Sequence, residues 1–199
     1  AAKRDSFWGV RKEACIAYGK LKPKINPSDL SWLENEKDNR VKRAFIGILK
    51  HSVGDPTVSE FLQNIIRSDT SYYAIADAFR VLTTIDSISA KKHVDDLLNT
   101  ESHNDVIRKA ALFYFGHVKN HNNYNRLKKF AEYGVFSWKS RPTIISELGK
   151  YHKYSPETLD FVLPFINDND RFVRMAVIKY IGSHGYVNHF DLLDSAVGL

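Results

Sequence analysis

The chain has 199 residues, of which 43% are hydrophobic and 13% aromatic, a composition too apolar for a disordered segment and sufficient for a substantial core. The single cysteine, Cys15, excludes an internal disulfide, and no apolar run approaches the roughly 20 residues that span a membrane, so we expect a cytoplasmic protein without a membrane partner. Lys and Arg exceed Asp and Glu by 29 − 23 = 6, but the basic residues are scattered in short groups, which is typical of solvated helix faces.

Hydrophobic periodicity predicts helices, and almost no strand, along the chain. A lone helix is predicted over 5–21, and a linker bounded by Pro23 and Pro27 follows it. Five helix pairs come next, at 28–35 and 40–50, 57–67 and 71–84, 89–99 and 105–118, 122–133 and 138–151, and 156–166 and 170–183. A last unpaired helix is predicted over 188–197. We therefore expect five full hairpins with half of a hairpin at each end.

A short motif recurs in the second helix of each pair. Its central position is usually basic and is occupied in turn by Arg11, Lys42, Ala74, Arg108, Arg141 and Arg174, at intervals of 31, 32, 34, 33 and 33 residues. Eight residues later, four copies carry glycine, at Gly19, Gly116, Gly149 and Gly182. A near-constant period of this size is the mark of a repeat array, so we predict one elongated repeat domain over 1–199.

Two features of the motif have a physical explanation. Four residues before the centre, the last five copies carry a side chain that can accept hydrogen bonds from the first turn of a helix, namely Asp38, Thr70, Asn104, Ser137 and Asp170. We predict these residues to be N-caps. The glycines are expected to let neighbouring helices approach closely, although each costs about 1 kcal/mol relative to Ala inside a helix.

The sequence contains no motif of a catalytic or metal-binding site that we recognise. His117 and His121 have the i, i+4 spacing of a helical zinc site, but no Glu follows His117 and a turn is expected at His121. Cys15 lies among small apolar residues, where a buried thiol is usual. Glu101-Ser102-His103 is expected to be a loop between helices. We predict no catalytic residue, cofactor or metal ligand in this chain.

The repeat unit resembles a HEAT-type repeat, and four segments are similar, in the same order, to the C-terminal HEAT-like region of zinc aminopeptidases of the aminopeptidase N class. They are Asp5-Ser6-Phe7-Trp8-Gly9-Val10-Arg11-Lys12-Glu13-Ala14, Asp69-Thr70-Ser71-Tyr72-Tyr73, Glu101-Ser102-His103-Asn104-Asp105-Val106-Ile107-Arg108, and Glu132-Tyr133-Gly134. The similarity covers about 5–184. The sequence departs from the repeat pattern at Lys42 and Ala74, where Arg is usual, and at Lys50 and Leu82, where Gly is usual.

The resemblance implies an all-α, right-handed superhelix of HEAT-like helical hairpins that forms the C-terminal part of a longer chain. The parent would carry zinc in its own catalytic domain, and none of its zinc ligands or its catalytic glutamate has a counterpart here. The implied partners are the upstream catalytic domain and peptide substrate in transit, since the domain would pack on the former and wall the chamber that the latter enters. Two alternatives stay open: a free-standing protein-binding scaffold, and a HEAT-type nucleic-acid binder supported only by the net charge and the aromatic residues.

Phe7 and Trp8 are the candidate interface to the missing domain. Both stand at the start of the first predicted helix, which has no partner helix of its own. Large apolar side chains left in water usually mark an interaction site. The alternative is that both rings fold inward onto residues 28–35, with Trp32 as their neighbour.

Overall fold

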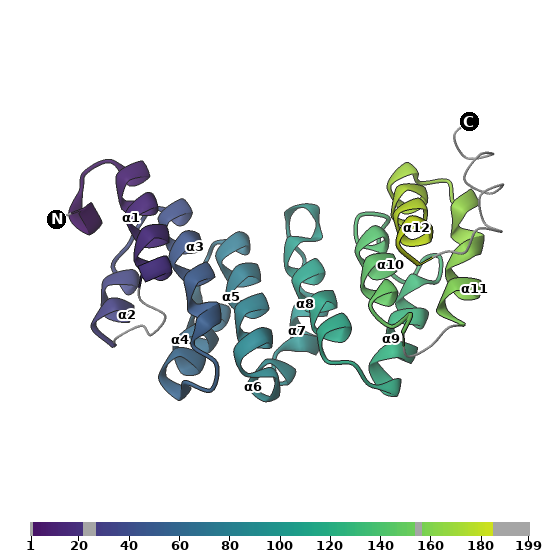
Figure 1. Ribbon diagram of the computed structural model, residues 1–199, viewed down its shortest axis with the longest axis horizontal. Helices are drawn as coiled ribbons and strands as arrows, with labels where there is room; N and C mark the ends of the chain where they lie inside the picture. Colours follow the sequence, from purple (N-terminus) through teal and green to yellow (C-terminus); the bar gives the residue numbers. More distant parts are fainter. Residues whose placement is uncertain (1, 22–26, 154–156, 185–199) are drawn as a thin grey trace. The chain divides into compact units, whose positions relative to one another are not determined.

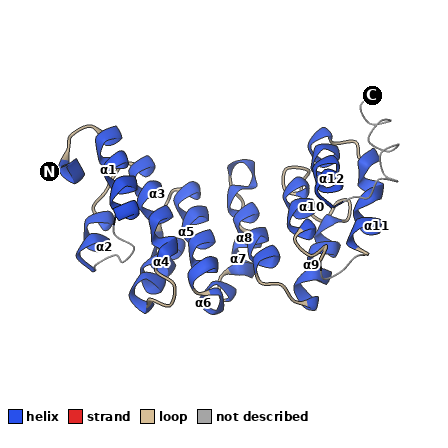
Figure 2. Ribbon diagram, viewed as in Figure 1, coloured by secondary structure: helices blue, strands red, loops and turns tan. Residues whose placement is uncertain are grey.

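A computed structural model of the protein describes residues 2–21, 27–153 and 157–184, and in these ranges every regular element is a helix (Figures 1 and 2). No strand occurs among these residues, and one isolated bridge joins Tyr133 to Phe136. The prediction of an all-α fold is confirmed for the residues that the structure describes. The helix predicted over 188–197 lies outside the described residues.

The helices are named here in chain order. In the first half they are η1 (Ala2–Arg4), α1 (Trp8–Leu21), α2 (Pro27–Glu34), α3 (Asn39–Ile48), η2 (Leu49–His51), α4 (Pro56–Ser68), α5 (Tyr72–Ile85), α6 (Ser87–Lys91), α7 (Val94–Asn99) and η3 (His103–Asp105). The rest are α8 (Val106–His117), α9 (His121–Ala131), α10 (Arg141–Gly149), α11 (Thr158–Val162), η4 (Leu163–Asn167) and α12 (Arg171–His184).

Two predicted helices are interrupted in the structure. The helix predicted over 89–99 is two short helices, because the N–H groups of Lys92 and His93 bond three residues back and end α6 before α7 begins. The helix predicted over 156–166 comprises α11 and the 3-10 helix η4. Pro164 lies at the start of η4, where its missing N–H and its ring prevent a continuous α-helix.

The chain divides within α8 into two compact units, Ala1–Tyr114 (unit 1) and Phe115–Leu199 (unit 2). In unit 1, the second helices of consecutive hairpins, α1, α3 and α5, pack side by side, and α4 packs against α5. In unit 2, α10 packs against both α9 and α12. Rings and aliphatic side chains form each core, with Phe45 and Phe79 in unit 1 and Leu127 and Ile144 in unit 2 all inaccessible to solvent.

Two of the predicted N-caps are confirmed. The Asp38 carboxylate accepts the N–H of Arg40 (2.9 Å) at the start of α3, and Asp170 accepts the N–H of Phe172 (2.8 Å) at the start of α12. The cap predicted at Thr70 is wrong by one residue, because Ser71 accepts the first-turn N–H of α5 instead.

The caps predicted at Asn104 and Ser137 are also wrong. Asn104 has a left-handed backbone (φ 54°), a conformation that Asn tolerates better than most residues, and the hydroxyl of Ser102 accepts the N–H of Ile107 in its place. Ser137 precedes a turn, so α10 begins only at Arg141 and its N-cap residue is Ser140.

Three motif glycines lie where helices approach closely. A Cβ atom on Gly19 would overlap Ile48 of α3, and one on Gly116 would overlap Glu147 of α10. On Gly149 it would lie 2.8 Å from Cδ2 of Tyr180 in α12. Gly182 differs, since such a Cβ would have no described neighbour within 4 Å beyond the adjoining backbone of its own helix. A close contact across helices therefore accounts for three of the four glycines, whereas at Gly182 the described residues show none.

Candidate functional site

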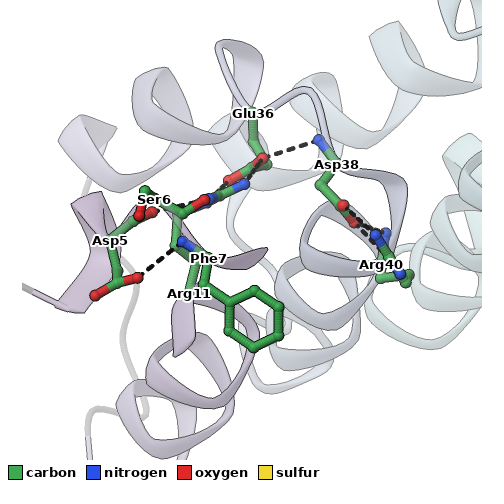
Figure 3. A network of polar contacts seen from close by, with 7 residues as sticks. All are labelled: Asp5, Ser6, Phe7, Arg11, Glu36, Asp38 and Arg40. Atoms are coloured by element: carbon green, nitrogen blue, oxygen red, sulfur yellow. Dashed lines mark hydrogen bonds and ion pairs between the residues drawn. The ribbon is translucent and has the colours of Figure 1, made fainter. Parts of the chain in front are cut away.

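The first copy of the motif joins three pieces of unit 1 through the guanidinium of Arg11 (Figure 3). From the first turn of α1, Arg11 donates through Nε and Nη2 to the two carboxylate oxygens of Glu36 (2.8 and 2.9 Å), which precedes α3. Its Nη1 donates to the carbonyls of Asp5 (2.8 Å) and Ser6 (3.0 Å). This bidentate pairing with a carboxylate is particular to arginine. It fixes the start of α1 against the α2–α3 turn.

The Arg11–Glu36 pair is shielded from water, with side-chain exposures of 17% and 5%. The hydrogen bond from Arg11 lowers the pKa of Glu36, and burial opposes it only in part. Glu36 in turn raises the pKa of Arg11. Oε1 of Glu36 also accepts the N–H of Asp38 (2.9 Å). The carboxylate therefore orders the turn that leads into α3 as well as the guanidinium.

The same linkage recurs in two further copies of the motif. Lys42 of α3 binds Asp69 before α5 (2.7 Å), and Arg141 of α10 binds Asp168 before α12 (2.6 Å). Each of these acids also accepts the backbone N–H two residues further on, from Ser71 (2.8 Å) or Asp170 (2.9 Å) respectively. In all three cases, a basic residue on one second helix holds the turn before the next second helix.

Arg108 and Arg174 each contact residues of their own hairpin. Arg108 donates from Nε to the carbonyl of Leu98 (2.8 Å) and pairs with Asp105 (3.0 Å). Arg174 donates from Nη1 to the carbonyls of Asp168 (2.8 Å) and Asn169 (3.1 Å). At the central position of the third copy, Ala74 is fully buried and has no charged side chain that could form such an ion pair.

The sequence pattern identified Arg11, Lys42 and Arg141, the basic residues of the three ion pairs between neighbouring repeats. It missed their acidic partners. A signal for the acids exists in the sequence, because Glu36, Asp69 and Asp168 each stand two residues before the N-cap of the next second helix. The three pairs are separated by 25 or 27 residues along the chain, so no local pattern joins them.

The two candidate interface residues have different surroundings (Figure 3 draws Phe7). Phe7 is 58% exposed, with its ring 5.5 Å from that of Trp8. Trp8 is half-buried because the Arg40 guanidinium of α3 lies 3.5 Å from the centre of its ring. Asp38 holds Arg40 in place (2.7 Å), and this pairing lowers the pKa of Asp38 to about 2. The Phe7 ring is therefore exposed to solvent, whereas the Trp8 ring is covered by Arg40.

Metal-ligating side chains do not gather in the described part of the chain, where no group of three or more His, Cys, Asp or Glu is placed to hold an ion. His117 ends α8 and His121 begins α9, so the two do not share a helix. Burial lowers the pKa of His117, and Lys150 and Lys119 add to the effect.

Within the described ranges, none of the helices has both the length and the apolar character of a transmembrane span.

Comparison with known proteins adds no relative: no family model matches the chain, and no curated protein is significantly similar to it.

Proposed function

We propose that this chain is a non-catalytic domain of HEAT-like hairpins, arranged as a right-handed superhelix, in a zinc aminopeptidase. In this role it packs on the catalytic domain and walls the chamber that peptide substrates enter. The observation that carries the proposal is the recurring link from a motif base to the turn before the next second helix, at Arg11–Glu36, Lys42–Asp69 and Arg141–Asp168. Such nearest-neighbour contacts are how repeat arrays hold together.

The aminopeptidase part of the proposal rests on the segment Asp5 to Ala14, whose residues have defined roles in the fold. Asp5 accepts the N–H of Phe7 (2.8 Å) just before α1, and Arg11 ties α1 to Glu36. The segment that resembles the aminopeptidase region is thus also the segment that orders the start of unit 1.

The contact with the catalytic domain is assigned to Phe7 and Val10, which are 58% and 40% exposed at the start of α1. The Arg11 network holds these side chains on a fixed backbone, so an approaching surface meets a preorganised apolar patch. Trp8 supports the patch from beneath Arg40.

A free-standing protein-binding scaffold is the second candidate. It is favoured by Tyr72 and Tyr73, which stand at the start of α5 in the same unit and are 46% and 44% exposed. Tyrosine supplies much of the binding energy at protein interfaces.

The coding sequence upstream of Ala1 separates the two candidates. We expect a His-Glu-x-x-His helix there, because two imidazoles on one helix face with a carboxylate between them are what zinc peptidase chemistry requires. If the upstream sequence holds no such motif, the aminopeptidase proposal is wrong and the scaffold takes its place.

In the full-length parent, Phe7→Ala is expected to expose the catalytic-domain surface beneath it, seen as faster hydrogen exchange there and earlier cleavage between the domains by a protease. Val53→Ala is the matched control, since Val53 is 70% exposed elsewhere in unit 1. Equal exchange in wild type and both variants would place the domain contact elsewhere.

A further inference from the structure

In unit 2, the neighbouring second helices α10 and α12 (green and yellow in Figure 1) each have an exposed aromatic residue at the N-terminal end. Trp138 precedes α10 and Phe172 lies in the first turn of α12; they are 51% and 42% exposed. Their ring centroids are 6.3 Å apart and their planes differ by 14°, so the two rings lie nearly parallel and close together as one exposed aromatic pair. Met175, one turn further along α12, extends this surface and is 48% exposed.

The repeat register shows that this surface has a closed counterpart in unit 1. Trp138 stands three residues before Arg141, as Trp8 does before Arg11, and Phe172 stands two residues before Arg174, as Arg40 does before Lys42. In unit 1 the arginine covers the tryptophan and is neutralised by Asp38. In unit 2, Phe172 occupies the position that corresponds to Arg40. No guanidinium from that position covers Trp138, and the rings of Trp138 and Phe172 both stay about half exposed.

Two cations flank the rings of unit 2. Lys139 lies 5.9 Å from the centre of the Trp138 ring, and Arg171 lies 4.8 Å from that of Phe172. Neither forms an ion pair within the described ranges, where Asp168 pairs with Arg141 and Asp170 caps α12. Among the residues that the structure describes, the surface therefore combines two exposed rings with two cations that form no ion pair.

We propose that Trp138, Lys139, Arg171, Phe172 and Met175 form a docking surface for an acidic peptide segment of a partner protein. The segment presents a large apolar side chain to the two rings and Asp or Glu side chains to the two cations. Aromatic residues, Met and Arg are the types enriched at protein interfaces. A nucleic acid fits less well, since its affinity depends on many phosphate contacts and this surface offers two cations and a thioether.

This surface is separate from the Phe7 patch in unit 1, and the proposal does not depend on an aminopeptidase parent. It predicts binding of the fluorescein-labelled peptide Asp-Glu-Leu-Phe-Glu-Asp to the whole chain, measured by anisotropy and weakening as salt is added. The charge-reversed peptide Lys-Lys-Leu-Phe-Lys-Lys should not bind.

Substitutions on the surface should reduce the affinity for the acidic peptide by roughly tenfold or more, whether the ring (Trp138→Ala) or the charge (Arg171→Glu) is removed. The matched controls, Ile88→Ala and Arg67→Glu, change exposed residues of unit 1 and should leave the affinity unchanged. All four side chains are exposed, and an unchanged circular dichroism spectrum verifies that each variant is folded.

Three results would overturn the proposal. The first is no saturable binding of the acidic peptide, and the second is equal affinity for wild type, Trp138→Ala and Arg171→Glu. The third is tighter binding of an oligothymidine of about ten nucleotides than of the peptide, which would assign the rings to base stacking instead. None of these results bears on whether a zinc aminopeptidase domain lies upstream, so the two proposals fail independently.

Discussion

At the scale of a single residue, the carboxylate of Glu36 accepts hydrogen bonds from two segments of unit 1. It receives two hydrogen bonds from Arg11 and one from the backbone of Asp38, and its side chain is 5% exposed. Removing one partner of such a group leaves the other buried without its counter-charge, which costs more than the pair itself contributes. We therefore expect the contribution of each basic motif residue to stability to depend on its acidic partner.

Glu36→Gln should lower the free energy of unfolding by roughly 1.5–3 kcal/mol at neutral pH, because it removes hydrogen bonds made to a charged group. The pKa of Glu36 in the folded chain lies below its ordinary 4.5. Its contribution is therefore complete above that value and is lost as the pH falls through the lower, folded one. Urea unfolding across this range should show the difference between wild type and variant shrinking with acid.

Glu60→Gln is the control for this pH dependence, because Glu60 is exposed on α4. Its stability should follow that of wild type at every pH. A Glu36→Gln deficit that stays constant from about pH 7 to about pH 3 would mean that the lost contacts do not depend on the charge of Glu36.

At the scale of the helices, glycine determines how closely the second helices approach. Gly19 of α1 faces Ile48 of α3 with no room for a Cβ atom, whereas Gly47 of α3 has no described heavy atom outside its own helix within 4 Å of that position. The same residue type thus permits contact at one position and only weakens the helix at the other.

Gly19→Ala should therefore destabilise the chain by about 1–3 kcal/mol through overpacking against Ile48. Gly47→Ala should be neutral or stabilising by up to about 1 kcal/mol, because alanine is the better helix former. Thermal unfolding of both variants is the measurement. If Gly19→Ala melts at or above the wild-type temperature, α1 and α3 do not approach as closely as described.

At the scale of the whole molecule, the described residues share two features: the charges of the motif are paired, and several aromatic rings are exposed. The buried charges of the motif, at Glu36, Asp69, Arg141 and Asp168, are engaged with one another or with backbone groups. Exposed rings lie at the starts of α1, α5 and α12, just before α10, and at Tyr133 after α9.

The isolated chain should neither hydrolyse aminoacyl-naphthylamides nor retain zinc, since no ligand set with zinc spacing is found in its sequence. The measurements are release of naphthylamine and metal content after dialysis. Stoichiometric zinc, together with hydrolysis that a chelator abolishes, would contradict this prediction and place a catalytic centre within the chain.

The sequence alone determined most of the described helices and the basic positions of the motif, because these depend on periodicity and on side chains within a few residues of each helix start. The caps at Asp38 and Asp170 are such local features, whereas at Asn104 the backbone conformation overrode the local signal. Only the tertiary structure paired Arg11 with Glu36, covered Trp8 with Arg40 and left Trp138 and Phe172 half exposed. Each of these outcomes depends on how one helix is rotated and spaced against the next, and packing between segments distant in sequence sets that geometry.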